Sequence, residues 1–225
     1  LVRSSFSANI KERRDCSTAL FDEGGRMIAQ AEHIPVHLGA MPDAVAAVMA
    51  EDPERDDVFV LNDPYAGGTH LPDITLVSRT EVGFAVTRAH HADVGGSEPG
   101  SMPADSRTLN DEGVVIPPTR LDDEVLAGLV SRMRNPEERR GDFRAQLAAH
   151  HLAERRLTEL CERRGRDRIV AAMDSLFAYS ERVVRSALSR LPNGRFEGTD
   201  VLEAGEEDLP IHVAVQIVIL VVGLL

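Results

Sequence analysis

Short apolar runs bounded by turn residues dominate the first half of the chain and predict β-strands. The runs at 18–22 and 26–30 flank Glu23-Gly24-Gly25, whose glycines adopt positive φ easily, so we expect a β-hairpin there. Three more runs predict further strands, at residues 57–61, 74–78 and 83–88. The N-terminal half is therefore expected to be rich in β-structure.

One short helix and two loops are expected around these strands. Pro35 and Gly39 predict a loop before Asp43, which can cap a helix that runs to about Glu51. The apolar side of this helix would consist of Val45, Val48 and Met49. The stretch 95–118 is rich in Gly, Pro, Ser and Asp, which predicts a long loop, and long ordered loops usually carry function.

Apolar residues at helical spacing predict two long helices in the second half. Asn135 is a good capping residue and Pro136 is favoured at the first helical position, so a helix is expected from here to Arg164. A second helix at 167–191 ends at Pro192-Asn193-Gly194. β-structure is expected to begin again after this turn.

These elements together predict an α+β protein. We expect a β-rich region with a loop-built site, then a helical hairpin, then the start of a truncated β region, at residues 1–130, 131–194 and 195–225. The apolar run 213–225 is too short for a membrane-spanning helix, which needs about 20 apolar residues. We interpret it as a buried strand that is cut off or a tail scrambled by a frame change, and the chain as a fragment.

Charge and composition narrow the class of function. A net charge of −12 leaves no basic surface for phosphates, so we expect no nucleic-acid partner. Lys11 is the only lysine, and the Gly-Lys-Ser/Thr step of a P-loop is therefore absent. Cys16 and Cys161 form no redox or metal pair and are expected to be buried free thiols in a reducing compartment. With no apolar signal segment at the start, we expect a cytoplasmic protein without a membrane partner.

Two His-x-x-Asp steps form the strongest candidate for chemistry. His70 and Asp73 make up the first step and His90 and Asp93 the second, and each step lies at a predicted strand end beside a Gly-Gly pair. His70 and Asp73 can face one ion, and His90 or Asp93 can complete the set while leaving a position open for water or substrate. Imidazole with carboxylate suits Mn²⁺, Zn²⁺ or Fe²⁺. The alternative, turn capping, explains one such step more easily than two.

The remaining histidines give weaker signals. His33 and His37 stand four residues apart, but Pro35 between them interrupts a helix, so they are expected to line a pocket or satisfy a loop. His150 and His151 fall within a long predicted helix and are expected to be ordinary surface or interface residues.

A charged cluster is expected at the start of the long helix. Arg134 and Arg139 can form salt bridges with Asp142, and anion binding there is the alternative. Neither a Gly-x-Ser-x-Gly elbow nor a cysteine beside a histidine is present, so nucleophilic side-chain catalysis is not favoured.

Several long segments resemble the hydantoinase B/oxoprolinase family. The resemblance extends from the first hairpin to about Val215 and is carried by residues 14–22, 32–42, 62–73, 90–103, 112–118 and 134–142. The final segment 216–225 departs from the family pattern. The family includes subunits of ATP-dependent hydantoinase, the C-terminal half of 5-oxoprolinase, and large subunits of acetone and acetophenone carboxylases.

The resemblance implies a reaction shared between two subunits of a hetero-oligomer. An A-type partner would consume ATP to phosphorylate the carbonyl oxygen of a small cyclic amide, and the activated species would then reach this chain. Residues that match His70, Asp73 and His90 would hold a divalent metal that activates water or binds the substrate oxygen. Asp63 and Asp93 would orient these ligands or add to them.

The same resemblance assigns catalytic roles to His33 and His37, which would position substrate or shuttle protons. The expected function is ATP-dependent hydrolysis of a cyclic amide such as hydantoin or 5-oxoproline. The alternatives are the large subunit of an ATP-dependent ketone carboxylase and a non-catalytic, metal-stabilised scaffold that binds a partner.

Overall fold

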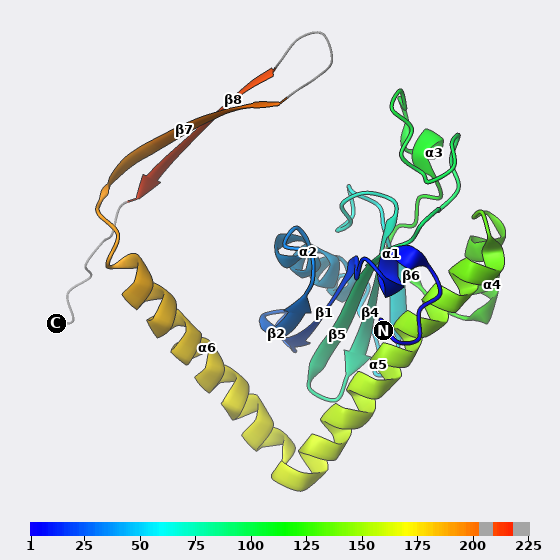
Figure 1. Cartoon of the computed structure of the whole chain (residues 1–225). Coiled ribbons are helices and arrows are strands. Elements are labelled where there is room, and N and C mark those ends of the chain that lie inside the picture. Colours follow the sequence, from blue (N-terminus) through cyan, green and yellow to red (C-terminus); the bar gives the residue numbers. More distant parts are fainter. Residues whose placement is uncertain (203–208, 218–225) are drawn as a thin grey trace. The chain divides into compact units, whose positions relative to one another are not determined.

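The computed structural model describes residues 1–202 and 209–217 (Figure 1). Contacts within the chain divide it into two compact units, Leu1–Met173 and Asp174–Leu225. The end of the apolar tail, residues 218–225, lies outside the described residues. The two units are described separately below.

A six-stranded antiparallel sheet forms the centre of the first unit. Its strands lie in the order β2-β1-β5-β4-β3-β6. Their bounds are Cys16–Asp22 for β1, Met27–Glu32 for β2, Val58–Leu61 for β3, Asp73–Thr80 for β4, Gly83–His90 for β5 and Thr119–Arg120 for β6. The predicted hairpin is β1–β2, and the three other predicted strands are β3, β4 and β5. The β1–β5 pairing joins strands that are far apart in the chain.

Five helices accompany this sheet. They are α1 at Ala8–Lys11, α2 at His37–Met49, α3 at Leu109–Glu112, α4 at Asp123–Ser131 and α5 at Pro136–Arg164. The segment predicted to be a long loop thus contains the short helix α3. Helix α4 was not expected from the sequence.

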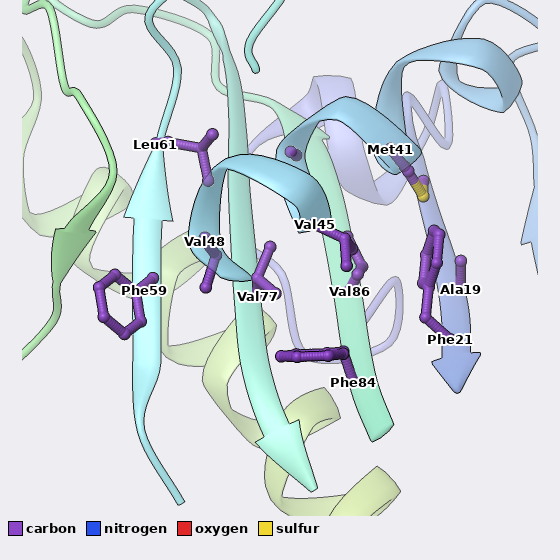
Figure 2. Close-up of a cluster of buried hydrophobic side chains, with 11 residues drawn as sticks. Ala19, Phe21, Met41, Val45, Val48, Phe59, Leu61, Val77, Phe84 and Val86 are labelled. Carbon is purple, nitrogen blue, oxygen red and sulfur yellow. The ribbon is translucent and has the colours of Figure 1, made fainter. Parts of the chain in front are cut away.

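Side chains alternate between the two faces of the sheet along each strand, and each face packs into its own buried hydrophobic cluster. On one face, Val77 of β4 and Val86 of β5 pack with Val45 and Val48 of α2 (Figure 2). On the other face, Leu76 and its neighbours pack against α4 and α5. Because successive residues of a strand point to opposite faces, every second residue of β4 and β5 belongs to the α2 face.

Helix α2 begins at His37, six residues before the predicted capping residue Asp43, and Pro42 lies inside it. The expectation of a loop through Gly39 was therefore wrong. A proline in a helix interior costs roughly 3 kcal/mol, but the helix buries Met41 and Val45 against the sheet with at most 1% exposure. Full burial of one such side chain contributes about 1.5–3 kcal/mol, so packing outweighs the helix-breaking effect of proline.

The start of α5 also differs in detail from the prediction. Pro136 is the first helical residue, as expected, and the helix ends at Arg164 before Gly165. Asn135, however, adopts a left-handed conformation with φ of 53° and its side chain makes no capping hydrogen bond. The helix boundary is thus confirmed, while the predicted side-chain cap is wrong.

The remaining described residues form a helix and a β-ribbon. Helix α6 spans Arg166–Leu188, and β7 at Gly194–Leu202 pairs antiparallel with β8 at Leu209–Ile217. The α+β class expected from the sequence is confirmed. The division between the two units falls inside α6, and the predicted three-part organisation stays a prediction.

Candidate metal centre

A carboxylate and an imidazole lie side by side on neighbouring strands, at one end of β4 and β5. Asp73, the first residue of β4, pairs with His90, the last residue of β5. The Nδ1 atom of His90 lies 3.2 Å from Oδ1 of Asp73. Both side chains lie on the face covered by α2, because they alternate in step with Val77 and Val86 of that face. The sheet register thus fixes two of the predicted metal ligands.

The loop between β3 and β4 adds a third ligand candidate. His70 lies in this loop, and its Nε2 atom is 2.9 Å from Oδ1 of Asp73. The loop folds back tightly at Gly68, where a Cβ atom would lie only 2.2 Å from the carbonyl oxygen of Asn62. At Gly67, with φ of +91°, a Cβ atom would lie 2.8 Å from the carbonyl oxygen of Asp43 in α2. The Gly-Gly pair therefore lets the backbone turn and bring His70 over Asp73.

The buried side chain of Asn62 holds this loop in place. Its Nδ2 atom donates hydrogen bonds to the carbonyl oxygens of Leu71, at 2.8 Å, and Val114, at 2.9 Å. Its Oδ1 atom accepts one from the backbone N–H of Ile116 at 2.7 Å. A single amide thus links both ends of the loop to the segment that precedes β6.

Two further side chains complete the cluster. His37, the first residue of α2, places Nε2 at 3.6 Å from Oδ2 of Asp73 and at 3.8 Å from Oδ1 of Asp15. The other oxygen of Asp15 lies 4.0 Å from Nδ1 of His90. Ser17 fixes the His37 ring through a 2.8 Å hydrogen bond to Nδ1. Three imidazoles and two carboxylates therefore meet at one end of the sheet.

Asp15 was missed in the sequence analysis. It precedes β1, whose pairing of Cys16 with Ala89 places Asp15 beside His90. The signal lies only in the β1–β5 register, which joins segments more than sixty residues apart in the chain and cannot be seen in the local pattern.

The electrostatics of the cluster favour an ionised carboxylate. Burial alone raises the pKa of Asp73, but hydrogen bonds from His37, His70 and His90 outweigh burial and hold that pKa well below its usual range. The hydrogen bond to Asp73 raises the pKa of His70. The three imidazoles thus stabilise the negative charge of the Asp73 carboxylate, and a bound cation would stabilise it in the same way.

The donor geometry fits a divalent ion. Metal–ligand bonds of about 2.0–2.1 Å place neighbouring tetrahedral ligands about 3.3 Å apart, close to the 2.9 Å and 3.2 Å that separate Asp73 from His70 and His90. The ligand atoms of His70, Asp73 and His90 all lie within 4.8 Å of one another, and so do those of Asp15, His37 and Asp73. The His70 side chain is 40% exposed and that of His37 only 2%, so the cluster opens to solvent on the His70 side.

Two other candidates from the sequence lie outside this cluster of contacts. Asp63 accepts a 2.9 Å hydrogen bond from the backbone N–H of Tyr65 within its own turn. His33 is exposed, with Nδ1 3.0 Å from the carbonyl oxygen of Cys16. Neither Asp63 nor His33 contacts the candidate ligand atoms in the described structure, and their roles in the site stay predictions.

Asp93 organises the loop that follows β5. Its carboxylate accepts hydrogen bonds from the N–H groups of Gly95 and Gly100, both at 2.8 Å, and pairs with Arg134 at 3.2 Å. Burial raises the pKa of Asp93, but these partners outweigh burial and hold that pKa below its usual range. The second His-x-x-Asp step therefore diverges, with His90 in the cluster and Asp93 in the loop.

The two arginines near the start of α5 have different carboxylate partners. Arg134 pairs with Asp93, whereas Arg139 lies 3.5 Å from Asp142 inside the fold. The predicted three-residue salt-bridge cluster is thus only partly correct.

His150 is not the surface residue that the sequence suggested. It is 2% exposed, and its ring is held between the hydroxyls of Ser78, at 2.7 Å, and Thr87, at 3.0 Å. The same face of the sheet buries His91, whose Nε2 lies 2.9 Å from Oε1 of Gln146. Helix α5 thus carries polar side chains into the core, which its sequence pattern does not reveal.

The expected burial of both cysteines is confirmed. Cys16 and Cys161 are buried free thiols, and burial raises the pKa of Cys16 to about 11. Neither is poised to act as a thiolate nucleophile.

Comparison with known proteins places this geometry in context. A family model described as hydantoinase B/oxoprolinase matches residues 1–219. The 5-oxoprolinase of Dictyostelium discoideum is 35% identical over 202 residues, which cover 84% of this chain and 16% of that enzyme. Caprolactamase subunit beta of Pseudomonas jessenii is 33% identical over 217 residues, which cover 90% of this chain and 37% of that subunit.

Solved structures show the same fold. The crystal structure of the ATP-dependent caprolactamase from Pseudomonas jessenii matches with a TM-score of 0.77 and 32% identity, over 84% of this chain and 35% of that one. The nucleotide-free structure of acetone carboxylase matches with a TM-score of 0.83 over 95% of this chain and 32% of that one, at 17% identity. The chain spans well under half the length of these relatives. With a family model that covers nearly all of its residues, the chain belongs to the hydantoinase B/oxoprolinase family.

Proposed function

We propose that this chain is the metal-binding part of a subunit of an ATP-dependent cyclic amide hydrolase. The observation that carries the proposal is the meeting of His70, Asp73 and His90 around one point, with Asp15 and His37 beside them. Relatives at 33–35% identity are named for the opening of cyclic amides, which favours this reaction over others that use the same ligand set.

The reaction would be divided between two subunits. An A-type partner transfers a phosphoryl group from ATP to the ring carbonyl oxygen and releases ADP. Water then adds to the activated carbon, and the C–N bond breaks as the nitrogen takes a proton. A second water converts the resulting acyl phosphate to carboxylate and inorganic phosphate.

The residues of this chain serve the water-addition step. A divalent Mn, Zn or Fe ion in such a site lowers the pKa of water and polarises a substrate oxygen. His70 and His90 offer imidazole nitrogens and Asp73 an ionised oxygen that would hold that ion. Asp15, with a side chain 28% exposed, offers a carboxylate oxygen that can accept the proton released as water adds. His37, buried beneath the two carboxylates, holds both from the protein side.

Two alternatives use the same site. The likeness to acetone carboxylase, at 17% identity, shows a shared fold and gives no specific support to carboxylation. In a partner-binding scaffold, the metal would stabilise the fold without taking part in turnover. The functional assay separates these alternatives from hydrolysis.

The test is turnover by this chain co-produced with an A-type subunit. With ATP and either 5-oxoproline, hydantoin or caprolactam, we expect ring opening and ADP release that stop when a chelator removes the metal. His70→Ala is expected to reduce both to background, whereas His151→Ala, on the exposed side of α5, is expected to retain them.

The outcomes distinguish the three functions. ATP use with acetone and bicarbonate, but without ring opening, would favour the carboxylase. Loss of metal in His70→Ala with full turnover would support the scaffold and contradict the proposal.

We also propose a cytoplasmic location for this activity. Among the described helices, none combines the length and apolarity required to cross a membrane.

A further inference from the structure

A second row of polar side chains lies beneath the Asp73–His90 pair, on the same face of the sheet. In the antiparallel ladder, Arg88 of β5 pairs with Ser17 of β1 on one side and with Thr75 of β4 on the other. Each of these three side chains is at most 1% exposed. The candidate metal ligands therefore rest on a fully buried polar layer whose centre is an arginine.

The guanidinium of Arg88 connects this layer to the loop that carries His70. Its Nε atom donates a 2.8 Å hydrogen bond to Oγ1 of Thr75 in β4. Its Nη1 atom donates to Oγ1 of Thr69 at 3.5 Å, and its Nη2 atom donates to the carbonyl oxygen of Gly67 at 3.4 Å. One side chain thus joins a strand to two positions of the loop just before His70.

Thr69 connects Arg88 to the central carboxylate. Its hydroxyl donates a 3.2 Å hydrogen bond to Oδ2 of Asp73 while it accepts from Arg88. Oδ1 of Asp73 faces His70 and His90. The hydroxyl of Thr69 therefore contacts the oxygen that is directed away from these two imidazoles.

The charge of Arg88 is hard to explain by folding alone. In the part of the chain that the structure describes, its guanidinium forms no direct ion pair within 4.0 Å, although the nearby charges of Asp73 and Asp43 act on it. Burying a charged group without a close partner is unfavourable, and an apolar side chain of similar size avoids that penalty. A purely structural layer would not need an arginine here.

We propose that Arg88 is a positioning residue of the metal centre, which fixes the loop carrying His70 and orients the Asp73 carboxylate through Thr69. The inference rests on the proposed metal site. A planar guanidinium reaches Thr75, Thr69 and Gly67 with donors at fixed angles, whereas a lysine carries one ammonium and does not reproduce this fork.

The loop itself provides a first test that needs no metal. The N–H groups of Ala66 and Gly68 donate to the carbonyl oxygen of Asp63 and report on the order of the loop through hydrogen exchange. In chelator-treated protein, we expect both amides to exchange faster in Arg88→Met and Arg88→Lys than in the wild type, while the amides of β4 and β5 keep their protection. Unchanged exchange at both amides would overturn the proposal.

The second test measures affinity for Zn²⁺ and Mn²⁺ by titration calorimetry. Thr69→Val removes the bridging hydroxyl at an exposed position and is expected to weaken binding by about 10-fold to 100-fold, as loss of a side chain that orients a ligand does elsewhere. Thr69→Ser keeps the hydroxyl and is expected to restore affinity. Thr80→Val is the matched control, because Thr80 lies on the same strand as Asp73 and its buried hydroxyl has no hydrogen-bond partner among the described residues.

The two readouts keep this inference separate from the proposed function. Equal affinities in wild type, Thr69→Val and Arg88→Lys would overturn the positioning role even if the metal site exists. A wild-type protein that binds neither ion would contradict the proposed function, and the exchange of Ala66 and Gly68 would then still decide whether Arg88 orders the loop.

Discussion

At the residue scale, two buried histidines carry rings that the fold keeps neutral. His150 lies between two hydroxyls of the sheet, and burial, with a smaller contribution from His151, lowers its pKa to about 3. Burial likewise lowers the pKa of His91 to about 4. An unfolded histidine titrates near pH 6.5, so both residues couple the stability of the chain to pH.

The sign of this coupling follows from the lowered pKa. Above about pH 6.5 these histidines are neutral in the folded and in the unfolded chain, so they do not reduce stability. Below that pH the unfolded chain binds protons that the folded chain does not bind, and stability falls. We expect each of these histidines to reduce the free energy of unfolding by about 1.4 kcal/mol per pH unit as the pH falls from about 6 toward the folded pKa.

Urea unfolding as a function of pH checks this expectation. His150→Gln removes one titrating group while keeping a polar side chain, so the loss of stability with acid should be shallower than in the wild type. The exposed His151→Gln serves as the control and should retain the wild-type slope. An equal slope in His150→Gln and wild type would show that His150 is not the group responsible.

At the element scale, the site depends on how segments distant in sequence are held together. Asn62 ties the loop that carries His70 to the segment before β6 through three hydrogen bonds between 2.7 Å and 2.9 Å. The amide is fully buried, so the backbone groups it serves have no access to water. A buried polar group left without a partner costs about 1–3 kcal/mol.

Replacement of Asn62 should therefore destabilise the first unit strongly. We expect Asn62→Ala to lower the free energy of unfolding by roughly 3 kcal/mol or more, because three backbone groups lose their partner. Asn110→Ala, at an exposed position in α3, is expected to change it by less than about 0.5 kcal/mol. Denaturant unfolding of the two variants provides the measurement, and a similar small effect in both would contradict the structural role of Asn62.

Elements with a strong local pattern could be predicted from the sequence, and those set by tertiary contacts could not. The apolar runs of β4 and β5, with the Gly67-Gly68 pair, predicted that His70, Asp73 and His90 would lie at the ends of neighbouring strands. The first turns of α2 escaped prediction because packing overrides the local effect of Pro42.

Side chains that serve the site from a distance were harder still to predict. Asp15 could not be found because its place depends on the β1–β5 register. Arg88 carried no signal either, because a single charged residue in an apolar strand shows neither its burial nor its partners. The burial of His150 depends on the sheet that α5 covers, which the helical pattern alone does not indicate.

At the scale of the whole molecule, the site belongs entirely to one unit. All three buried hydrophobic clusters and all five residues of the candidate metal centre lie within Leu1–Met173. In the described part of the second unit, the side chains of α6 and of the β7–β8 ribbon are largely exposed, and a two-stranded ribbon is marginally stable on its own.

A chain shortened to end at Met173 should consequently keep the first unit intact. We expect it to retain the circular-dichroism signal of the sheet and its helices per residue and to bind Zn²⁺ or Mn²⁺ as tightly as the full 225-residue chain. Unfolding of the shortened chain, or a loss of affinity of about 10-fold or more, would show that residues after 173 contribute to the site.

The central claim is that His70, Asp73 and His90 bind one divalent ion, and a titration of the chelator-treated chain with Zn²⁺ and Mn²⁺ tests it most directly. We predict saturable binding of one ion to the wild type, loss of that binding in His70→Ala, His90→Ala and Asp73→Asn, and unchanged binding in His151→Ala. Binding that persists equally in all four variants, or a wild type that binds neither ion, would contradict the account.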